Sequence, residues 1–206
     1  MKEKGRFIVF EGLDGAGTTT QMKRLGEEYN KRNRKVFLTH EPTDNPIGKV
    51  VRAALQKKFA TTPSALALLY SSDRDDHIYN REYGIEGHLN DGDIVISDRY
   101  FYSSYAYQSV ECDSSFVKEI NSRFPHADII IFIDTPVDAC LERIEKRGEE
   151  KELFEKEEYL KAVRKNYLEV FSSLPPQVTL ITIDGTKSID SISDEIRNKL
   201  EELSLL

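Results

Sequence analysis

The sequence lacks most of the features that mark a disulfide-rich, metal-binding or membrane protein. It has no tryptophan and only two cysteines, Cys112 and Cys140, which show neither a disulfide pattern nor metal-ligand spacing. No apolar run is long enough to span a membrane, and no signal peptide is visible. We therefore expect a cytoplasmic protein in a reducing compartment, without a membrane partner.

Positive charge is also in short supply. The net charge is -7 and the isoelectric point is near 5.3. A duplex-binding surface needs a basic face for its phosphate contacts, so we expect no nucleic-acid partner. Local basic clusters can still hold a small phosphate ligand.

Apolar and charged residues are present in the proportions of a soluble globular domain, at 39% and 32% of the 206 residues. Five short apolar runs do not alternate with polar residues, which is typical of strands that are buried on both faces of a sheet. These runs are residues 7–10, 36–38, 94–96, 129–133 and 178–183.

Apolar stripes at helical spacing lie between or after these runs. The stripes are Met22, Leu25 and Tyr29; Leu160, Val163, Tyr167 and Phe171; and Ile189, Ile192, Ile196, Leu200 and Leu203. Thr62 and Pro63 predict the start of a further helix, as its N-cap and its first residue. Strands that alternate with helices predict a mainly parallel sheet covered on both faces, with ligands at the carboxyl ends of the strands. We expect one domain over residues 1–206.

A loop rich in glycine and threonine follows the first apolar run. Gly12, Gly17 and Thr19 satisfy the phosphate-loop pattern G-x-x-x-x-G-K-[ST]. The glycines let successive backbone N–H groups point at an anion, and the N-terminus of the next helix adds partial positive charge. Thr19 would supply a hydroxyl ligand for Mg²⁺. The predicted ATP-binding residues of this loop are Gly12, Leu13, Asp14, Gly15, Ala16, Gly17, Thr18, Thr19 and Thr20.

Thr18 occupies the position of the lysine that normally reaches the β- and γ-phosphates. The change removes positive charge from the place where phosphoryl transfer most needs it. Either another cation replaces the lysine, or turnover is slow, or the loop is a relic. Two other interpretations are a degenerate dinucleotide fingerprint, with Glu41 holding a ribose, and a connection that binds no ligand.

Asp98 and Arg99 follow the third apolar run, which places them at the carboxyl end of a strand, on the side where the phosphate loop opens. A carboxylate there can hold Mg²⁺ through water, and an arginine can bridge two phosphate groups. The alternative is a buried ion pair that caps the strand. With a phosphate loop in the same chain, the sequence favours catalytic roles for both residues and a Mg²⁺ site formed by Thr19 and Asp98.

Segments spread over essentially the whole chain resemble the thymidylate kinase family. They are residues 10–17, 40–43 and 98–108, the charged stretch 143–155, and residues 163–167. The resemblance implies a three-layer α/β P-loop NTPase fold, with a five-stranded parallel sheet and a small lid around residues 143–155. It also implies transfer of the terminal phosphate of MgATP to dTMP, and a homodimer.

The resemblance assigns roles around the acceptor nucleotide. Asp14 would hold the 3′-hydroxyl of dTMP, and Arg52 would grip its phosphate together with Arg99. Tyr107 would crowd the 2′ position of the sugar and so favour deoxyribose. The other residues expected in this pocket are Glu41 and Pro42 along its wall, and Ser103, Ser104 and Gln108 facing the base.

Tyr70 and Arg74 stand where the family has an aromatic residue stacked on thymine and an arginine bonded to a base carbonyl. Because they are four residues apart, they lie on one face of a helix and can approach the same planar ligand. The alternative is that Tyr70 is a core residue and that Arg74 extends to solvent along its apolar stem.

The charged stretch raises a similar choice, since it is either a mobile lid or a solvated helix and loop. Arg143 and Arg147 are four residues apart, so they would put like charges on one helix face. This is unfavourable unless an anion lies between them. ATP phosphates are such an anion for Arg147, and the resemblance implies that Arg143 stacks on adenine; glutamates such as Glu150 are the alternative partners. We hypothesise that Arg147 is a catalytic residue, which supplies the positive charge that Thr18 lacks.

His40 and Leu153 also depart from the family pattern, because an arginine is usual at both positions. We expect these changes to affect the rate of phosphoryl transfer more than the binding of dTMP. Two other functions stay open: a kinase of another nucleoside monophosphate, and a nucleotide-binding regulatory protein that lost catalysis with its lysine. A dinucleotide-dependent oxidoreductase ranks third, because it leaves Asp98 and Arg99 without a role.

Overall fold

A parallel sheet forms the centre of the molecule. The computed structural model describes residues 5–146 and 153–206, without the side chains of residues 153–156. The strands are β1 (Arg6–Gly12), β2 (Val36–His40), β3 (Ile94–Asp98), β4 (Ile129–Asp134) and β5 (Thr179–Asp184). Their order across the sheet is β2-β3-β1-β4-β5, and every neighbouring pair is parallel. Each predicted apolar run therefore lies in a strand, apart from Val178, which precedes β5.

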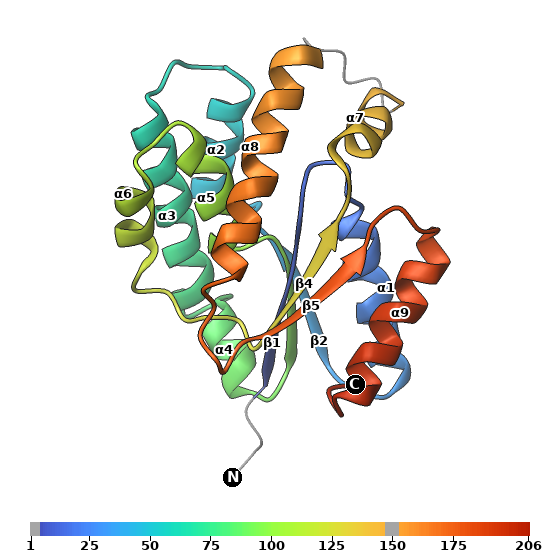
Figure 1. Cartoon of the computed structure of the whole chain (residues 1–206). Coiled ribbons are helices and arrows are strands. Elements are labelled where there is room, and N and C mark those ends of the chain that lie inside the picture. The colour runs from blue at the N-terminus through green and yellow to red at the C-terminus, as the bar shows by residue number, and fades with distance from the viewer. Residues whose placement is uncertain (1–4, 147–152) are drawn as a thin grey trace.

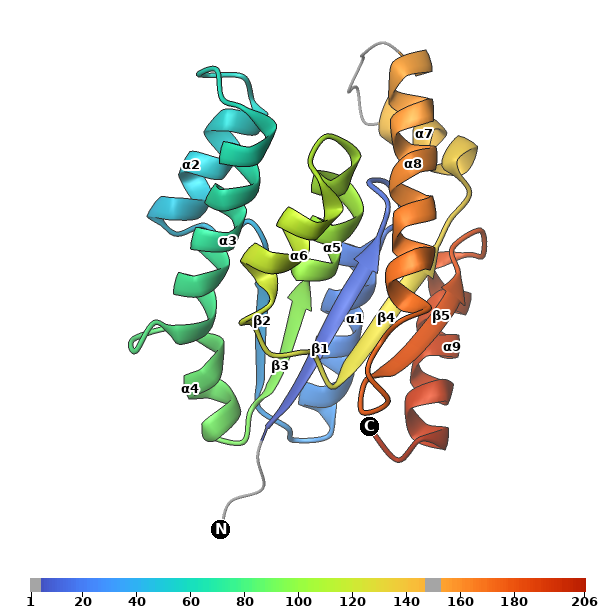
Figure 2. The ribbon, with the colours of Figure 1, turned by 60° about the vertical axis from the view of Figure 1, so that its left-hand side comes forward.

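Helices cover both faces of this sheet. The helices along the chain are α1 (Thr18–Lys31), α2 (Pro46–Leu55), α3 (Pro63–Tyr79), α4 (Ile85–Asn90), α5 (Phe101–Tyr107), the short 3₁₀ helix η1 (Gln108–Val110), α6 (Ser114–Asn121), α7 (Val137–Glu145), α8 (Leu153–Phe171) and α9 (Ile189–Glu202). In Figures 1 and 2, α1 and α9 lie against one face, and α3, α5 and α8 lie on the other. The predicted three-layer α/β fold is confirmed.

The apolar stripes explain how these helices pack. Every member of the predicted stripes of α1 and α8 is buried. In α9 the middle of the stripe is buried, but Ile189 and Leu203 are 54% and 49% exposed. These two residues are the first residue of α9 and the residue after its last, so the stripe packs only where the helix lies over the sheet.

The N-terminus of α3 forms as the sequence predicts. The Thr62 hydroxyl accepts a hydrogen bond from the backbone N–H of Ala65 at 3.2 Å, and Pro63 is the first helical residue. This cap satisfies one of the N–H groups that a helix start leaves without a partner. It fixes where α3 begins, and α3 carries several side chains of the candidate site.

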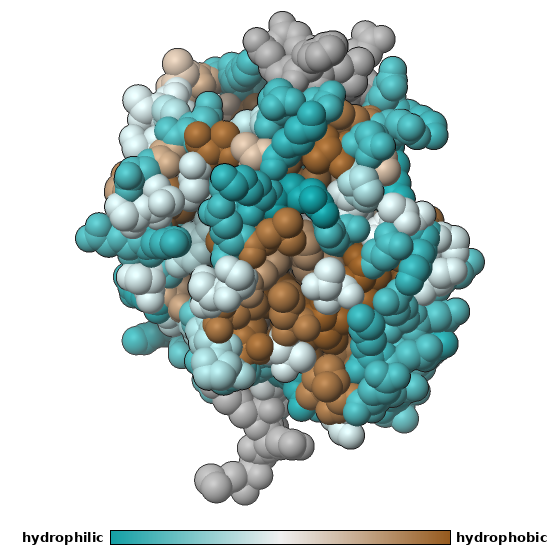
Figure 3. Space-filling model, viewed as in Figure 1, coloured by the Kyte–Doolittle hydropathy of each residue, from teal (hydrophilic) through white to brown (hydrophobic). Residues whose placement is uncertain are grey.

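One area of the surface is apolar. Figure 3 shows apolar side chains gathered over β4 and β5 and beside the end of α8. Leu174, Val178 and Leu180 belong to the segment from the end of α8 into β5, and they pack against the core while staying partly exposed. Among the described residues, no helix combines the length and apolar character that a membrane crossing requires.

Candidate active site

The loop between β1 and α1 has the geometry of an anion cradle. Gly15 and Gly17 have φ values of 88° and 95°, which favour glycine. A Cβ atom on Gly12 would lie 3.0 Å from both the carbonyl oxygen of Ile133 and the Cβ of Ala16, so the close approach of β1 and β4 needs a glycine there. Gly17 is the N-cap of α1, whose N-terminus therefore points its free N–H groups into the loop.

The residues for a divalent cation lie at the edge of this loop. Residue Asp98 pairs with Phe10 across β3 and β1, which brings its carboxylate beside the start of α1. The Thr19 hydroxyl donates to Asp98 Oδ2. Asp98 Oδ1 is buried and has no hydrogen-bond partner among the described residues. A hydroxyl and an unsatisfied carboxylate oxygen suit Mg²⁺, which prefers oxygen ligands and keeps several waters.

Thr18 lies at the lysine position and is only 7% exposed. Its methyl group would be 3.2 Å from a Cβ on Gly12, so the side chain packs against the loop that it follows. The side chain is short and uncharged. The described part of the loop therefore contains no cationic side chain of its own.

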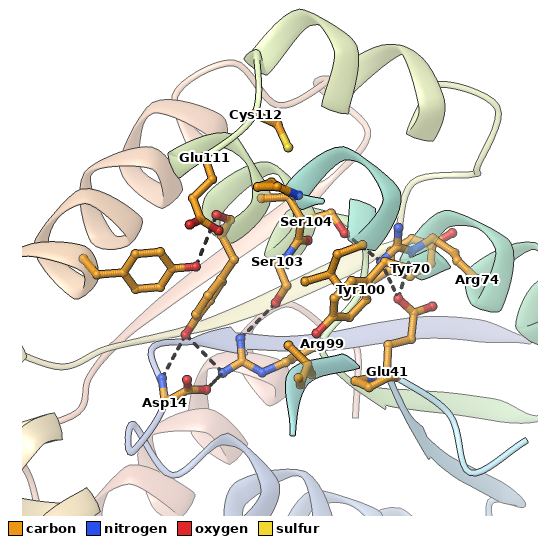
Figure 4. A pocket seen from close by; sticks show the side chains of 17 residues that line it. Asp14, Glu41, Tyr70, Arg74, Arg99, Tyr100, Ser103, Ser104, Glu111 and Cys112 are labelled. Atoms are coloured by element: carbon orange, nitrogen blue, oxygen red, sulfur yellow. Dashed lines mark hydrogen bonds and ion pairs between the residues drawn. The ribbon is translucent and has the colours of Figure 1, made fainter. Parts of the chain in front are cut away.

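Arg99 connects the loop to the neighbouring cavity. Its φ of 73° is left-handed, which costs a non-glycine residue roughly 1 kcal/mol. Its backbone N–H donates to the carbonyl of Phe10 at 2.9 Å. Its guanidinium donates to Asp14 Oδ1 at 2.6 Å and lies 4.9 Å from the centre of the Tyr107 ring. Figure 4 shows the guanidinium between the loop and Ser103. Asp14 of the phosphate loop therefore meets Arg99 and Tyr107 of the segment 98–108.

Glu11 lies under Arg99 and was not predicted as a site residue. One of its carboxylate oxygens accepts from the backbone N–H of Tyr100 at 2.9 Å. The other accepts from the hydroxyls of Ser103 at 2.6 Å and Tyr167 at 2.8 Å. The same two hydroxyl oxygens accept from Arg99 Nη1 at 3.1 Å and 3.2 Å. Glu11 therefore holds Arg99 indirectly, through two shared hydroxyl groups.

Burial controls the protonation of this group of side chains. Loss of solvent raises the pKa of the Glu11 carboxyl to about 7, although Arg99 and the hydrogen bonds oppose the rise. Burial also raises the pKa of Tyr70 to about 12, and it raises the pKa values of Tyr107 and Tyr167 above their usual range. The phenols are therefore neutral hydroxyls at physiological pH.

Arg74 forms the opposite wall of the cavity and is 1% exposed. Its Nε donates to Glu41 Oε2 at 2.8 Å, its Nη2 donates to the Ser104 hydroxyl at 3.1 Å, and its Nη1 donates to Asn121 Oδ1. Figure 4 shows Arg74 facing Glu41 and Ser104. The alternative interpretation, in which Arg74 extends to solvent, is wrong because the guanidinium is buried among these partners.

A cavity of about 420 Å³ lies between these two walls. This volume suits a mononucleotide-sized ligand. The predicted residues that line it are Asp14, Glu41, Pro42, Tyr70, Arg74, Arg99, Ser103, Ser104, Tyr107 and Gln108. The lining residues not predicted from the sequence are Leu55, Pro63, Leu66, Tyr100, Glu111, Cys112 and Tyr159. Most of these are apolar or carry no motif, so the sequence offered no signal for them.

Arg52 is the predicted substrate residue that does not line this cavity in the described structure. Its guanidinium donates to the carbonyl oxygens of Pro42 and Thr43 and to His40 Nε2 at 2.9 Å, and it pairs with Asp44 at 3.1 Å. His40, which replaces an arginine of the family pattern, therefore lies in contact with Arg52. Arg52 stabilises the segment that carries Glu41 and Pro42.

Arg143 contacts the phosphate loop from α7. Its Nη1 donates to the carbonyl of Gly15 at 3.2 Å, and its Nη2 donates to the carbonyl of Gly185 at 2.8 Å. These backbone contacts place the guanidinium at the loop without a glutamate partner in the described structure. Arg147 and Glu150 lie outside the described residues, and so does the side chain of Leu153, so the predicted lid is described only at its two ends.

The phosphate loop at the carboxyl end of the central strand, beside a cavity of nucleotide size, defines a P-loop nucleotide-binding protein. A family model described as "Thymidylate kinase" matches residues 10–196. Similar proteins, all named provisionally as thymidylate kinases, include one from Treponema pallidum that is 38% identical over 199 residues, with 95% of each chain covered. Others are 37% identical, from Pyrococcus horikoshii with 94% of each chain covered and from Methanocaldococcus jannaschii with 96% of each covered. The chain belongs to the thymidylate kinase family.

Proposed function

We propose that the protein transfers the terminal phosphate of MgATP to dTMP, giving dTDP and ADP for dTTP synthesis. One observation carries this proposal: Arg99 joins the phosphate loop, through Asp14, to a cavity that is lined by the predicted dTMP-binding residues. A donor phosphate in the loop and an acceptor phosphate in the cavity would meet at this guanidinium. An arginine at that place can bind both groups and neutralise charge in the transition state.

The donor would bind along residues 12–20, with its phosphates facing the backbone N–H groups and the N-terminus of α1. Thr19 and Asp98 would hold Mg²⁺, and the unsatisfied Asp98 Oδ1 supports this assignment. When bound, the ion would neutralise charge on the transferred phosphate. Arg143 would face the adenine side from α7, where it already contacts the loop.

The acceptor would lie along the cavity with its base between Tyr70 and α5. Asp14 would accept a hydrogen bond from the 3′-hydroxyl, and Tyr107 would exclude a 2′-hydroxyl. Arg99 would bind the phosphate, with Arg52 supporting the segment beside it. Arg74 would donate to a base carbonyl; Ser103, Ser104 and Gln108 would complete the contacts to the base, beside Glu41 and Pro42.

In-line phosphoryl transfer needs no covalent intermediate, so this chain would act by positioning and by charge neutralisation. Asp98 and Arg99 would serve as catalytic residues together with Thr19. Arg147 in the predicted lid would supply the charge that Thr18 lacks, and closure of the lid around residues 143–155 would exclude water.

Three further proposals concern the extent, the assembly and the location of the chain. The chain would be a single kinase domain over residues 1–206, it would form a homodimer, and it would work in the cytoplasm with ATP and dTMP as its partners.

A coupled ADP-release assay tests the proposal. The protein is supplied with MgATP and, in separate reactions, with dTMP, dUMP, dCMP, dGMP, AMP or UMP. Turnover confined to dTMP, with a smaller rate for dUMP, is the expected result. Fast turnover of another acceptor would make the protein a kinase of that nucleotide. No turnover, together with calorimetric binding of dTMP and ATP, would support a regulatory protein inactivated at Thr18.

A further inference from the structure

His77 is a buried residue that does not line the cavity itself but contacts Glu41, which does. It lies on α3, one turn after Arg74, and is 2% exposed. Its Nδ1 lies 3.0 Å from Glu41 Oε1, and its Nε2 lies 2.6 Å from the hydroxyl oxygen of Thr39 on β2. The ring therefore connects an edge strand of the sheet to the carboxylate that faces Arg74.

Glu41 divides its two oxygens between these partners. Oε1 faces His77, and Oε2 accepts from Nε of Arg74 at 2.8 Å and lies 2.7 Å from its Nη2 in an ion pair. Burial alone would raise the pKa of this carboxyl, but Arg74 and His77 outweigh burial and hold the pKa below its usual range. Without His77, Oε1 would be a buried charged oxygen with no partner, and the carboxylate would rotate to find one.

Arg74 depends on this carboxylate for its orientation. Nε donates to Glu41, with Nη2 in ion-pair contact with the same oxygen, while Nη2 donates to Ser104 and Nη1 donates to Asn121. Each Nη carries two N–H groups, so the second N–H of Nη1, which has no partner among the described residues, is left for a ligand in the cavity that Arg74 lines. The direction of that donor is fixed by the plane of the guanidinium, and Glu41 holds one full edge of this plane.

We infer that His77 is a positioning residue, which fixes Glu41 and through it Arg74, and so selects a pyrimidine with a carbonyl rather than an amino group at position 4. The inference rests on the proposed function, because it takes dTMP as the ligand of the cavity. A fixed N–H donor matches a carbonyl oxygen and opposes the N–H donors of an amino group. A guanidinium that is free to rotate discriminates less between the two.

Two substitutions separate the two ring nitrogens. The amide nitrogen of His77→Asn can replace Nδ1 and keep the contact to Glu41, whereas that of His77→Gln can replace Nε2 and keep only the contact to Thr39. We expect His77→Gln to raise the KM for dTMP about tenfold and to lower the dTMP/dCMP ratio of kcat/KM about tenfold, with kcat and the KM for ATP nearly unchanged. His77→Asn should retain both the KM and the ratio.

The matched control is Ile78→Val, which shortens a buried side chain on the same helix without touching the network. It should leave both readouts unchanged. Equal loss of selectivity in His77→Asn and His77→Gln would overturn the inference, and so would a raised KM with an unchanged dTMP/dCMP ratio. If neither variant folds, Thr39→Val decides, because it removes only the hydroxyl at Nε2 and leaves the contact of Nδ1 to Glu41. It should retain the selectivity, and a loss of selectivity in that variant would overturn the inference.

The test of His77 can be decided separately from the test of the proposed kinase activity. If the unaltered protein turns over no acceptor, the kinase proposal fails. Calorimetric affinities for dTMP and dCMP then measure selectivity without turnover. A dTMP preference that falls in His77→Gln and persists in His77→Asn would still support the positioning role. The same ratio of dTMP to dCMP affinity in the unaltered protein and both variants would end it.

Discussion

Glu11 is an ionisable side chain whose position makes the stability of the protein depend on pH. Its pKa rises from 4.5 to about 7 on folding because the carboxyl is completely buried. Between these values the folded state binds a proton that the unfolded state has released. The stability from this group is therefore complete below pH 4.5 and is lost as the pH rises towards 7, a change of roughly 3 kcal/mol.

The variant Glu11→Gln tests this directly, because an amide keeps the shape and does not titrate in this range. We expect the free energy of unfolding of the unaltered protein to fall relative to that of the variant by about 1 kcal/mol per pH unit between pH 5 and pH 7. Urea unfolding at several pH values measures both. Parallel pH dependence in the two proteins would show that Glu11 does not titrate there.

Thr18 leads to the second prediction at this scale. If Arg147 replaces the missing loop lysine, Arg147→Ala should lower kcat by two or more orders of magnitude, with little change in dTMP affinity. Steady-state kinetics and calorimetry provide the two quantities. The neighbouring Lys146→Ala is the control, since Lys146 is 77% exposed and pairs with Glu142. Unchanged turnover in Arg147→Ala would refute the idea.

Residues were predictable where a motif or a resemblance named them. Asp14 was predicted from one segment and Arg99 and Tyr107 from another, and the three residues do meet. Glu11 was not predicted as a site residue, and Tyr167 was predicted only as a member of an apolar stripe, because nothing local shows that a buried hydroxyl and a buried carboxylate will pair. Such pairs depend on contacts between distant parts of the chain, in this case between β1 and α8.

Among the elements, α3 links helix stability to the cavity, because it carries Tyr70, Arg74 and His77. Thr62→Ala removes its N-cap hydrogen bond, so we expect a loss of about 1 kcal/mol in the free energy of unfolding. For a chain of this size the midpoint of thermal unfolding should fall by about 2–4 °C. Thermal unfolding followed by circular dichroism measures the change. The exposed neighbour Thr61→Ala should leave the midpoint unchanged, and equal effects in both variants would contradict the role of the cap.

The elements also differ in how well their sequences predict them. Every strand was recognisable from its apolar run. Burial on both faces explains this for β1, β3 and β4, but the expectation of such burial is wrong for the edge strands β2 and β5, where Leu38 for example is 40% exposed. Helices α1, α8 and α9 show their stripes over several turns. The shorter α5 (Phe101–Tyr107) has too few turns for a periodic pattern, and its buried residues include Phe101, Tyr102 and Ala106 as well as Ser104. Its place beside the cavity follows from the turn at Arg99, which no local pattern specifies.

At the scale of the whole molecule, the resemblance predicts a homodimer. Sedimentation velocity over a range of protein concentrations should give one species with twice the mass of a single chain. The same experiment with dTMP and MgATP should leave that mass unchanged, because the proposed site is complete within one chain. A single-chain mass at every concentration would remove the homodimer from the proposal and leave the kinase function standing.

The central place of β1 affects how the chain must be made. β1 ends at Gly12, but its two neighbours in the sheet, β3 and β4, begin only at Ile94 and Ile129. During synthesis, the first strand therefore leaves the ribosome long before either partner exists, and its apolar side chains have no sheet to enter. Such non-local pairing slows folding and leaves strand edges open to other chains. The interval between translation of β1 and of β4 is when this protein has the greatest need of a chaperone.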